Sequence, residues 1–403
     1  MIPKGWQEKT LGEICTFSRG LTYSKKDEID ISDNIVLRAN NIDLISNTLN
    51  FDELKYLNKD FIIPEDKKIK KNSILICISS GSKSHLGKVA FIDKDYRYAF
   101  GGFMGLITPQ QGIFPRFLYY MLTSPAFTDF TSNLTDGANI NNLKFSDIKD
   151  FKLRICSLPE QERIVARLDK AFESIDKAKI IAETNLKNTK ELFESTLNNV
   201  FTKNTERWEK QKLKDISTSI QYGYTESASY NAVGPKFLRI TDIQNDTVVW
   251  DNVPYCVISD SDKKQYLLKN GDIVFARTGA TVGKSYLIEN LSCDAVYASY
   301  LIKVSVNKNC LYPNFVKFFF KSNSYWTQVI DKQTGAGQPN VNGTKLGQII
   351  IQYPSLPEQQ KIVKKLDKLQ EQTKQLEATY TKKIKSIDEL KQSILNKAFK
   401  GEL

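Results

Sequence analysis

The chain has 403 residues, of which 41% are hydrophobic and 26% are charged, an ordinary composition for a protein with two or three folded cores. Its 57 basic and 46 acidic residues give a net charge of +11, which favours a polyanionic partner such as nucleic acid, although a merely basic protein would share it. Six cysteines without a CxxC pair, and a single histidine, argue against a structural zinc site and suit a reducing cytoplasm. The chain opens without an apolar core of signal-peptide length and has no membrane-spanning run, so we expect a cytoplasmic protein.

Residues 1–152 are predicted to form a mixed domain of helices and strands. A short helical start at residues 10–14 follows Trp6. Short apolar runs bounded by Asn, Gly and Ser predict strands at residues 35–37, 73–78 and 88–92. Pro115 opens a helical pattern that ends at Leu122, and residues 136–142 carry a strong loop signal.

The first long helix is predicted from about Pro159 to Phe201. Proline at the first turn, with Glu160 just behind it, is typical of a helix start. Apolar residues then recur in alternating steps of four and three, which is a heptad seam. Its members are Ile164, Leu168, Ala171, Ile175, Ala178 and Ala182.

Residues 206–352 repeat the first domain in outline. Trp208 and residues 213–216 match the opening around Trp6, and Pro313 matches Pro115 at an offset of 198. The skeleton is shared and the loops differ. This pattern is expected if each half recognises something different.

A second long helix closes the chain, and its start copies the first. Residues 157–170 and 355–368 are identical at ten of fourteen positions. The second seam runs through Ile362, Leu366, Leu369, Thr373, Leu376, Tyr380, Ile387, Leu390 and Ile394. Helices of roughly 60 Å need a partner to cover such a seam, and the other copy is the obvious one.

The sequence therefore predicts an α+β protein with two similar mixed α/β domains, each followed by a long helix. The two helices would pair as an antiparallel coiled coil with pseudo-twofold symmetry. The predicted segments are a first mixed domain at 1–152, a helix at 153–205, a second domain at 206–352 and a second helix at 353–403. The helical segments 157–202 and 355–403 contain 15 acidic and 18 basic residues, so +8 of the net charge lies elsewhere, mainly in the domains.

Three features resemble catalytic motifs but do not meet their requirements. Residues 279–285 have only three residues between the two glycines, whereas a Walker A loop needs four to wrap phosphates. Residues 252–255, Asn-Val-Pro-Tyr, resemble the Asn-Pro-Pro-Tyr site of adenine methyltransferases, but Val253 replaces a proline and no cofactor loop precedes it. His85 has no counterpart in the second half. We assign no catalytic, cofactor-binding or metal-binding residue.

Loops of both halves supply candidate DNA-binding residues. Residues 279–285 form a Gly-rich, Lys-bearing loop suited to a nucleic-acid backbone, and residues 334–340 carry amides that can pair with adenine. Aromatic residues stand beside glycine near the start of each domain, where half-buried core tyrosines are an equal explanation. The candidates are Arg19, Tyr23, Arg38, Ser80, Lys83, Lys88, Asn141, Tyr222, Tyr224, Arg239, Arg277, Thr278, Lys284, Gln338 and Asn340.

With its duplicated Leu-Pro-Glu-Gln helix starts, the chain resembles the specificity (S, HsdS) subunit of type I restriction–modification systems. The Trp-x4-Leu-x2-Ile domain openings and the Thr-Gly-Ala-Gly-Gln-Pro-Asn loop at 334–340 share this resemblance, which covers the whole chain. The first half departs from that loop at 136–142.

This resemblance implies that each half reads one part of a split double-stranded DNA site. Two methyltransferase (M) subunits would dock on the helices, and restriction/translocase (R) subunits could join them. S-adenosylmethionine, ATP and Mg would then act on those partners, and this chain would not be an enzyme. Helix-start residues become candidates for partner docking: Pro159, Glu160, Gln161, Pro357, Glu358 and Gln359.

Two other functions stay open on the sequence. One is a solitary DNA methyltransferase or nuclease acting through residues 252–255 or His85. The other is a coiled-coil scaffold with no DNA role.

Overall fold

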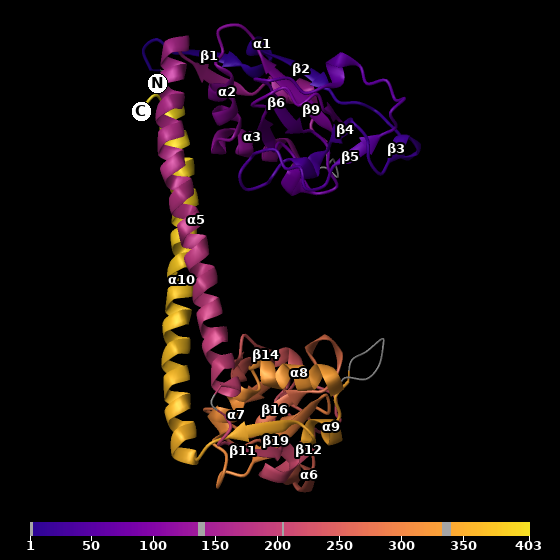
Figure 1. The fold of residues 1–403 in the computed structure, drawn as a ribbon, viewed down its shortest axis with the longest axis vertical. Helices are drawn as coiled ribbons and strands as arrows, with labels where there is room; N and C mark the ends of the chain where they lie inside the picture. Colours follow the sequence, from indigo (N-terminus) through magenta and orange to yellow (C-terminus); the bar gives the residue numbers. More distant parts are fainter. Residues whose placement is uncertain (1–2, 136–141, 204, 333–339) are drawn as a thin grey trace. The chain divides into compact units, whose positions relative to one another are not determined.

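The computed structural model describes residues 3–135, 142–203, 205–332 and 340–403. The chain divides into two compact units (Figure 1). Unit 1 comprises Met1–Glu183 with Lys382–Leu403, and unit 2 comprises Thr184–Thr381. Each unit holds one globular half and a part of both long helices, α5 (Leu158–Thr202) and α10 (Leu356–Lys400). The compact units differ from the four predicted segments, because each unit contains part of both long helices.

Unit 1 is built on a four-stranded antiparallel sheet with a strand buried on both faces. Ile74 and Ile76 pack in the cluster shared with the helices, and Leu75 and Cys77 pack in a second cluster on the opposite face. Burial on both faces explains why this strand reads as an unbroken apolar run. In sheet order the strands are β2 (Cys15–Arg19), β9 (Met104–Pro109), β6 (Ile74–Cys77) and β7 (Val89–Phe91).

A second sheet and several helices complete unit 1. The sheet order is β3 (Glu28–Ile29), β5 (Lys55–Leu57), β4 (Asn34–Leu37) and β8 (Ala99–Phe100), with β4 and β8 parallel. An antiparallel pair, β1 (Gln7–Thr10) and β10 (Lys152–Ile155), links the start of the unit to the strand before α5. The helices are α1 (Leu11–Ile14), α2 (Pro115–Leu122), α3 (Pro125–Thr135) and α4 (Phe145–Lys149). These elements confirm the strands and helices predicted between residues 10 and 122.

Unit 2 repeats this framework. Its main sheet has the equivalent order: β12 (Ser217–Tyr222), β19 (Leu301–Val306), β16 (Ile273–Ala276) and β17 (Ser285–Leu287). A parallel pair, β13 (Lys236–Leu238) and β18 (Ala295–Tyr297), matches β4 and β8, and β11 (Glu209–Lys212) with β20 (Ile350–Tyr353) matches β1 and β10. The predicted internal repeat is thereby confirmed at the level of strand pairing.

The peripheral elements differ between the units. Where unit 1 adds β3 and β5, unit 2 has a small hairpin and a short helix, β14 (Ile243–Gln244), β15 (Thr247–Val248) and α6 (Asp260–Tyr266). The remaining helices of unit 2 are α7 (Pro313–Phe319), α8 (Asn323–Lys332) and α9 (Gly343–Gly347). Variation is thus concentrated outside the shared sheet.

Each long helix begins with a buried glutamine that ties it to its own unit. Gln161 is fully buried; its side-chain oxygen accepts from Phe114 N at 2.8 Å, and its Nε2 donates to the carbonyls of Gly112 and Cys156. Gln359 makes the same contacts in unit 2, with Tyr312 N at 2.8 Å and with the carbonyls of Cys310 and Pro354. The repeated sequence at the helix start therefore has a structural cause.

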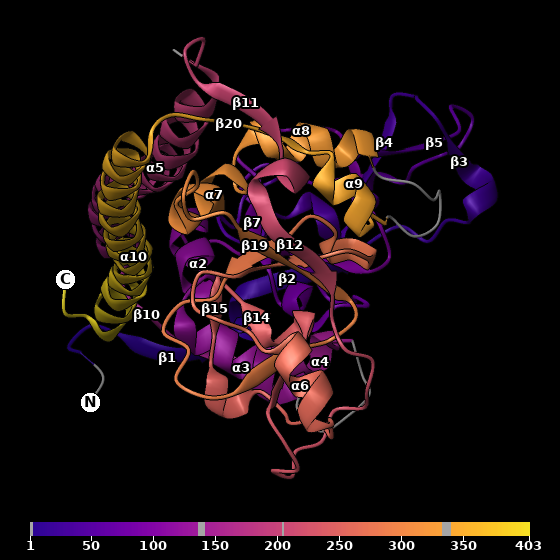
Figure 2. The same cartoon turned by 90° about the horizontal axis from the view of Figure 1, so that it is seen from below.

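Inside unit 1 the two long helices run antiparallel. Lys179 Nζ lies 2.6 Å from Asp388 Oδ1, and Asp176 Oδ1 lies 2.8 Å from Lys391 Nζ, so residue numbers fall along α5 as they rise along α10. In unit 2, other parts of the same helices share one buried cluster that includes Leu197 and Leu366. The helices lie side by side in both views (Figures 1 and 2). The predicted antiparallel pairing is confirmed.

The predicted seam is followed closely at its start and less well further on. Ile164, Leu168 and Leu366 are buried, and Thr373 is buried with its hydroxyl bonded to the carbonyl of Leu369. Leu376 and Leu390 remain 43% and 50% exposed. A two-helix pair covers its seam from one side only, which leaves some apolar positions open.

Candidate nucleic-acid interface

In each unit, the end of the first sheet strand passes directly over a neighbouring backbone. Gly20 follows β2, and a Cβ added there would lie 2.0 Å from the carbonyl oxygen of Gly101. Gly223 follows β12 in the equivalent way, with Ala298 O at 2.3 Å. Only glycine allows such a close approach. This crossing explains the glycines found beside aromatic residues in the sequence.

The crossed backbone forms a tight turn that carries an exposed aromatic ring. In unit 1, Met104 N donates to Gly101 O at 2.8 Å, and in unit 2, Leu301 N donates to Ala298 O at 2.8 Å. The third residue of each turn is Phe103 or Tyr300, 69% and 62% exposed. Neither residue was among the candidates chosen from the sequence, although their shared position in the repeat was a signal that could have identified them.

Four candidate residues of unit 2 come together beside this turn. Arg277 N donates to Tyr300 O at 3.2 Å, and its guanidinium lies 4.9 Å from the ring centroid of Tyr222. Thr278 pairs with Asn340 in an antiparallel bridge, and Gly343 N donates to the Tyr222 hydroxyl. Arg277 Nε and Asn340 Oδ1 are buried and find no hydrogen-bond partner among the described residues. Residues separated by more than a hundred positions thus form one polar cluster.

Unit 1 has the same backbone with different side chains. Ile78 N and Ser79 N both donate to Phe103 O at 3.0 Å, and Ser79 pairs with Asn142. Ile78, which is buried, occupies the place of Arg277. The cation comes instead from Arg19 at the end of β2, whose Nε donates to Gly102 O at 3.2 Å. The candidates Asn141 and Gln338 lie outside the described residues.

The paired candidates Arg38 and Arg239 differ in one neighbour. Arg239 makes a two-pronged ion pair with Asp242, and these hydrogen bonds raise the pKa of its guanidinium. In unit 1 Asn41 takes the acid's place and bonds the backbone N of Arg38. No carboxylate pairs with Arg38 in the described part of the chain.

The other candidates fall into exposed and internal groups. Lys83 and Lys284 are exposed on the loops that follow β6 and β16, and Ser80 is half-buried, accepting from Ser82 N. Tyr23 and Tyr224 pack against small buried clusters, and burial raises the pKa of both hydroxyls. For these two tyrosines the structure favours the core explanation that the sequence left open.

The Gly-rich loop at residues 279–285 has an internal reason for one glycine. A Cβ on Gly283 would lie 2.6 Å from the Trp326 ring, and its carbonyl accepts from the Tyr325 hydroxyl at 2.7 Å. The glycine therefore serves packing against α8, whereas its sequence had suggested close approach to a nucleic-acid backbone.

Residues 252–255, the Asn-Val-Pro-Tyr segment, also have an internal role. Lys236 Nζ donates to Val253 O at 2.8 Å and to Asp251 O at 3.2 Å, and it lies 4.0 Å from the Tyr255 ring centroid. The segment wraps a buried lysine.

The helix-start candidates divide in the same way. Pro159, Pro357 and Glu358 are exposed, and Glu160 is half-buried in an ion pair with Arg163. Gln161 and Gln359 were predicted to dock a partner, but their amides are buried and already bonded inside their units. The docking interpretation does not fit these two glutamines.

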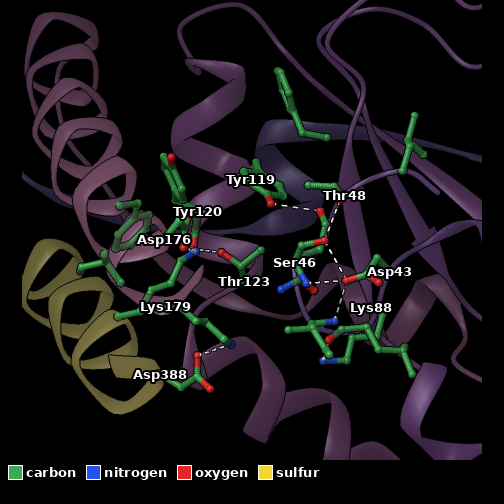
Figure 3. A pocket seen from close by; sticks show the side chains of 18 of the residues that line it. Asp43, Ser46, Thr48, Lys88, Tyr119, Tyr120, Thr123, Asp176, Lys179 and Asp388 are labelled. Carbon is green, nitrogen blue, oxygen red and sulfur yellow. Dashed lines mark hydrogen bonds and ion pairs between the residues drawn. The ribbon is translucent and has the colours of Figure 1, made fainter. Parts of the chain in front are cut away.

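A groove of about 940 Å³ in unit 1 lies between loop 43–51 and the helix pair (Figure 3). Lys88 lines it and donates to Leu44 O at 3.3 Å. Both acidic and basic side chains line the groove, including the ion pairs Lys179–Asp388 and Asp176–Lys391. Because the groove contains about as many acidic as basic groups, it does not favour a polyanion. Lys88 therefore lies in a different environment from the candidate residues beside the turns that carry Phe103 and Tyr300.

Within the described residues, no group of three or more His, Cys, Asp or Glu side chains is placed to hold a metal ion. The same part of the chain contains no helix long and apolar enough to cross a membrane.

Comparison with known families agrees with this duplicated architecture. Residues 3–186 and 191–386 both match the family described as the type I restriction modification DNA specificity domain. The chain belongs to this family. The resemblance drawn from its helix starts is confirmed, and its function is that of a DNA-specificity subunit.

The chain aligns with named relatives over nearly their whole length. The chain is 28% identical to the EcoKI type I specificity subunit of Escherichia coli K12 and 26% identical to the StySPI subunit of Salmonella potsdam, covering all of this chain and 90% of each relative. Among solved structures, a chain from work on complex assembly of the type I R-M system aligns over both full lengths at 19% identity with a TM-score of 0.80. The HsdS subunit from Thermoanaerobacter tengcongensis aligns at 19% identity with a TM-score of 0.61, over all of this chain and 98% of that one. These two share the fold.

Proposed function

We propose that each unit of this specificity subunit reads one part of a split DNA site. The observation that carries the proposal is one backbone frame with two sets of side chains. At the same crossing, unit 1 has an exposed Arg19 and a buried Ile78, whereas unit 2 has Tyr222 and Arg277 at the equivalent positions. Side chains specify bases through their hydrogen-bonding groups and shapes, so different sets on one frame suit two unequal sequences.

We infer that the chemistry belongs to partners. Two methyltransferase subunits would bind this chain and supply S-adenosylmethionine-dependent methylation, and restriction subunits would use ATP and Mg. The non-catalytic role is supported by the internal contacts of residues 252–255, the segment that resembles a methyltransferase motif. The carbonyl of Val253 and the ring of Tyr255 enclose Lys236.

We further infer that α5 and α10 determine how many unread base pairs separate the two parts. Both helices extend continuously over 45 residues and contribute to both units. A continuous helix is a stiff element with a fixed rise per residue, which suits a spacer.

The decisive experiment is to co-express the chain with its methyltransferase subunit and map methylated adenines across the host genome. The proposal predicts a split motif with a methylated adenine in each part. Methylation without sequence preference would contradict it.

Two alternatives have their own tests. A solitary methyltransferase would require the purified chain alone to bind S-adenosylmethionine. A scaffold without a DNA role would require that the chain with its partners show no salt-dependent DNA affinity.

A further inference from the structure

Phe103 and Tyr300 are large aromatic side chains left open at the same place in both units. They are 69% and 62% exposed, and each is the third residue of the turn beneath the glycine crossing. Isolated exposed apolar residues are common and need no explanation. Two aromatic rings at one repeated position, in halves whose neighbouring side chains have diverged, do need one.

The turn that carries each ring is fixed from several sides. In unit 1, Gly101 N donates to Leu37 O at 2.9 Å and Gly20 N donates to Met104 O at 3.1 Å. In unit 2, the matching bonds join Ala298 N to Leu238 O and Gly223 N to Leu301 O, at 2.9 and 3.0 Å. Strands from three parts of each unit therefore hold the backbone.

A fixed turn makes the exposed ring well suited to binding. The carbonyl of each aromatic residue is already used inside the unit, as the acceptor for Ile78 N or Arg277 N. The backbone position is thus set before any ligand arrives, and the entropic cost of ordering it on binding is small.

Each ring also stands next to cationic and polar groups. The Arg19 guanidinium bonds to Gly102 O, the residue before Phe103, and the cluster of Arg277, Thr278 and Asn340 adjoins Tyr300. Arginine side chains contact the phosphates or base edges of duplex DNA, and apolar side chains contact bases in its grooves, so this combination suits a DNA-facing surface.

We propose that Phe103 and Tyr300 each make an apolar contact with a base of the DNA, one in each part of the site. The inference rests on the proposed function and adds a division of roles. The rings seat each unit on the duplex in a sequence-tolerant way, while their polar neighbours select the bases.

The test uses the chain assembled with its methyltransferase subunit and a duplex carrying the wild-type methylation motif. DNA affinity is measured over a range of salt concentrations for Phe103→Ala and for Tyr300→Ala. Each variant should bind roughly 10- to 100-fold more weakly, the range expected when a large aromatic side chain no longer becomes buried on binding. The slope of log affinity against log salt should not change, because no phosphate contact is lost.

Matched variants separate the ring from general surface effects. Phe103→Tyr and Tyr300→Phe retain a ring and should keep wild-type affinity. Ile45→Ala in unit 1 and Val249→Ala in unit 2 remove exposed apolar side chains, 77% and 61% exposed, outside these turns and should change nothing. Unchanged thermal unfolding of every variant shows that the exposed positions do not disturb the fold.

Several results would overturn the inference. Unchanged affinity in both alanine variants removes the proposed contact, and a shallower salt slope indicates a phosphate contact instead. Loss of the methyltransferase subunit from the complex means that a protein partner covers the rings. If wild-type complex itself shows no preference for any sequence, the proposed function fails, which is distinct from a wild type that discriminates and variants that match it.

Discussion

At the scale of single residues, one acid-to-amide difference separates Arg38 from Arg239. Asp242 holds the guanidinium of Arg239 inside its own unit. Asn41 accepts from the backbone N of Arg38 and donates its own amide to the carbonyls of Asn50 and Glu53, so it does not bind the Arg38 guanidinium. A guanidinium without an internal carboxylate is free to meet a phosphate or a guanine edge. We therefore predict that Arg38 contacts DNA and that Arg239 mainly stabilises unit 2.

Arg38→Ala should weaken DNA binding by about 10-fold and, for a phosphate contact, reduce the salt slope by about 1. Arg239→Ala should leave the slope unchanged and lower the free energy of unfolding by about 1 kcal/mol. DNA titrations over a range of salt concentrations measure the affinity and the slope, and chemical denaturation measures the free energy of unfolding. Equal effects of both alanine variants on DNA would refute this assignment.

Lys303 is a buried lysine on β19, 5.6 Å from the ring centroid of Tyr297, and the nearby charge of Asp272 compensates its burial only in part. It is 7% exposed, its Nζ lies 3.4 Å from Leu267 O, and burial lowers its pKa. The pairing of Gln221 with Lys303 and of Ser18 with Leu106 shows that unit 1 has leucine at the equivalent place. A buried charge is costly in the folded chain.

Lys303→Leu should raise the free energy of unfolding by about 1 kcal/mol near neutral pH. There the lysine is charged in both states, and burial penalises the folded one. As pH rises above the lowered folded pKa towards 10.5, the folded lysine loses its proton first, so wild type regains stability and the difference shrinks. Denaturation at several pH values measures this, with exposed Lys264→Leu as control. A difference that stays constant or grows with pH contradicts the prediction.

At the scale of elements, the attachment of a long helix depends on one amide. Two hydrogen bonds of Gln359 join the start of α10 to the chain just before α7, and a third reaches Pro354, just before α10; Gln161 does the same between α5 and α2. The buried glutamine of each helix start therefore has a structural role that its exposed proline does not share, although the sequence repeats both residues.

Gln359→Leu should lower the free energy of unfolding of unit 2 by roughly 2–4 kcal/mol, because Tyr312 N and two carbonyls lose their buried partner. The neighbouring Gln360→Leu, at an exposed position, should cost less than about 0.5 kcal/mol. Thermal unfolding and faster hydrogen exchange at Tyr312 N report the difference. Equal losses of stability in the two variants would show that the hydrogen bonds of Gln359 contribute little.

At the scale of the whole molecule, two units with one sheet order carry different rims. The main sheets β2-β9-β6-β7 and β12-β19-β16-β17 correspond strand for strand, and each unit has its own buried clusters. Separate cores make each globular half a module whose rim can change without disturbing the other unit.

Replacing residues 206–352 with the equivalent half of a relative should change one part of the methylated motif and leave the other intact. The physical reason is that each turn and its polar neighbours belong to one unit. Methylation mapping of the co-expressed complex measures both parts together. A change in both parts would show that the units do not read independently.

The sequence by itself determined the duplication, the two helices, the main strands and the family. These features are local: a heptad seam, a proline at a helix start and an apolar run are each read within a few turns of chain. The antiparallel pairing also followed, because two long seams required a partner and only one was at hand. Candidate residues chosen by repeat position were partly useful, since Tyr222, Arg277, Thr278 and Asn340 do converge.

Only the tertiary structure decided which side chains face outward together. Gly20 meets Gly101 across 81 residues, and no local pattern marks Phe103 as the ring that this crossing leaves open. Gln161 and Gln359 are buried and make internal hydrogen bonds, and Lys88 lies in the groove and not beside the turn. Long-range backbone contacts fix these outcomes, whereas composition and periodicity report only on neighbours along the chain.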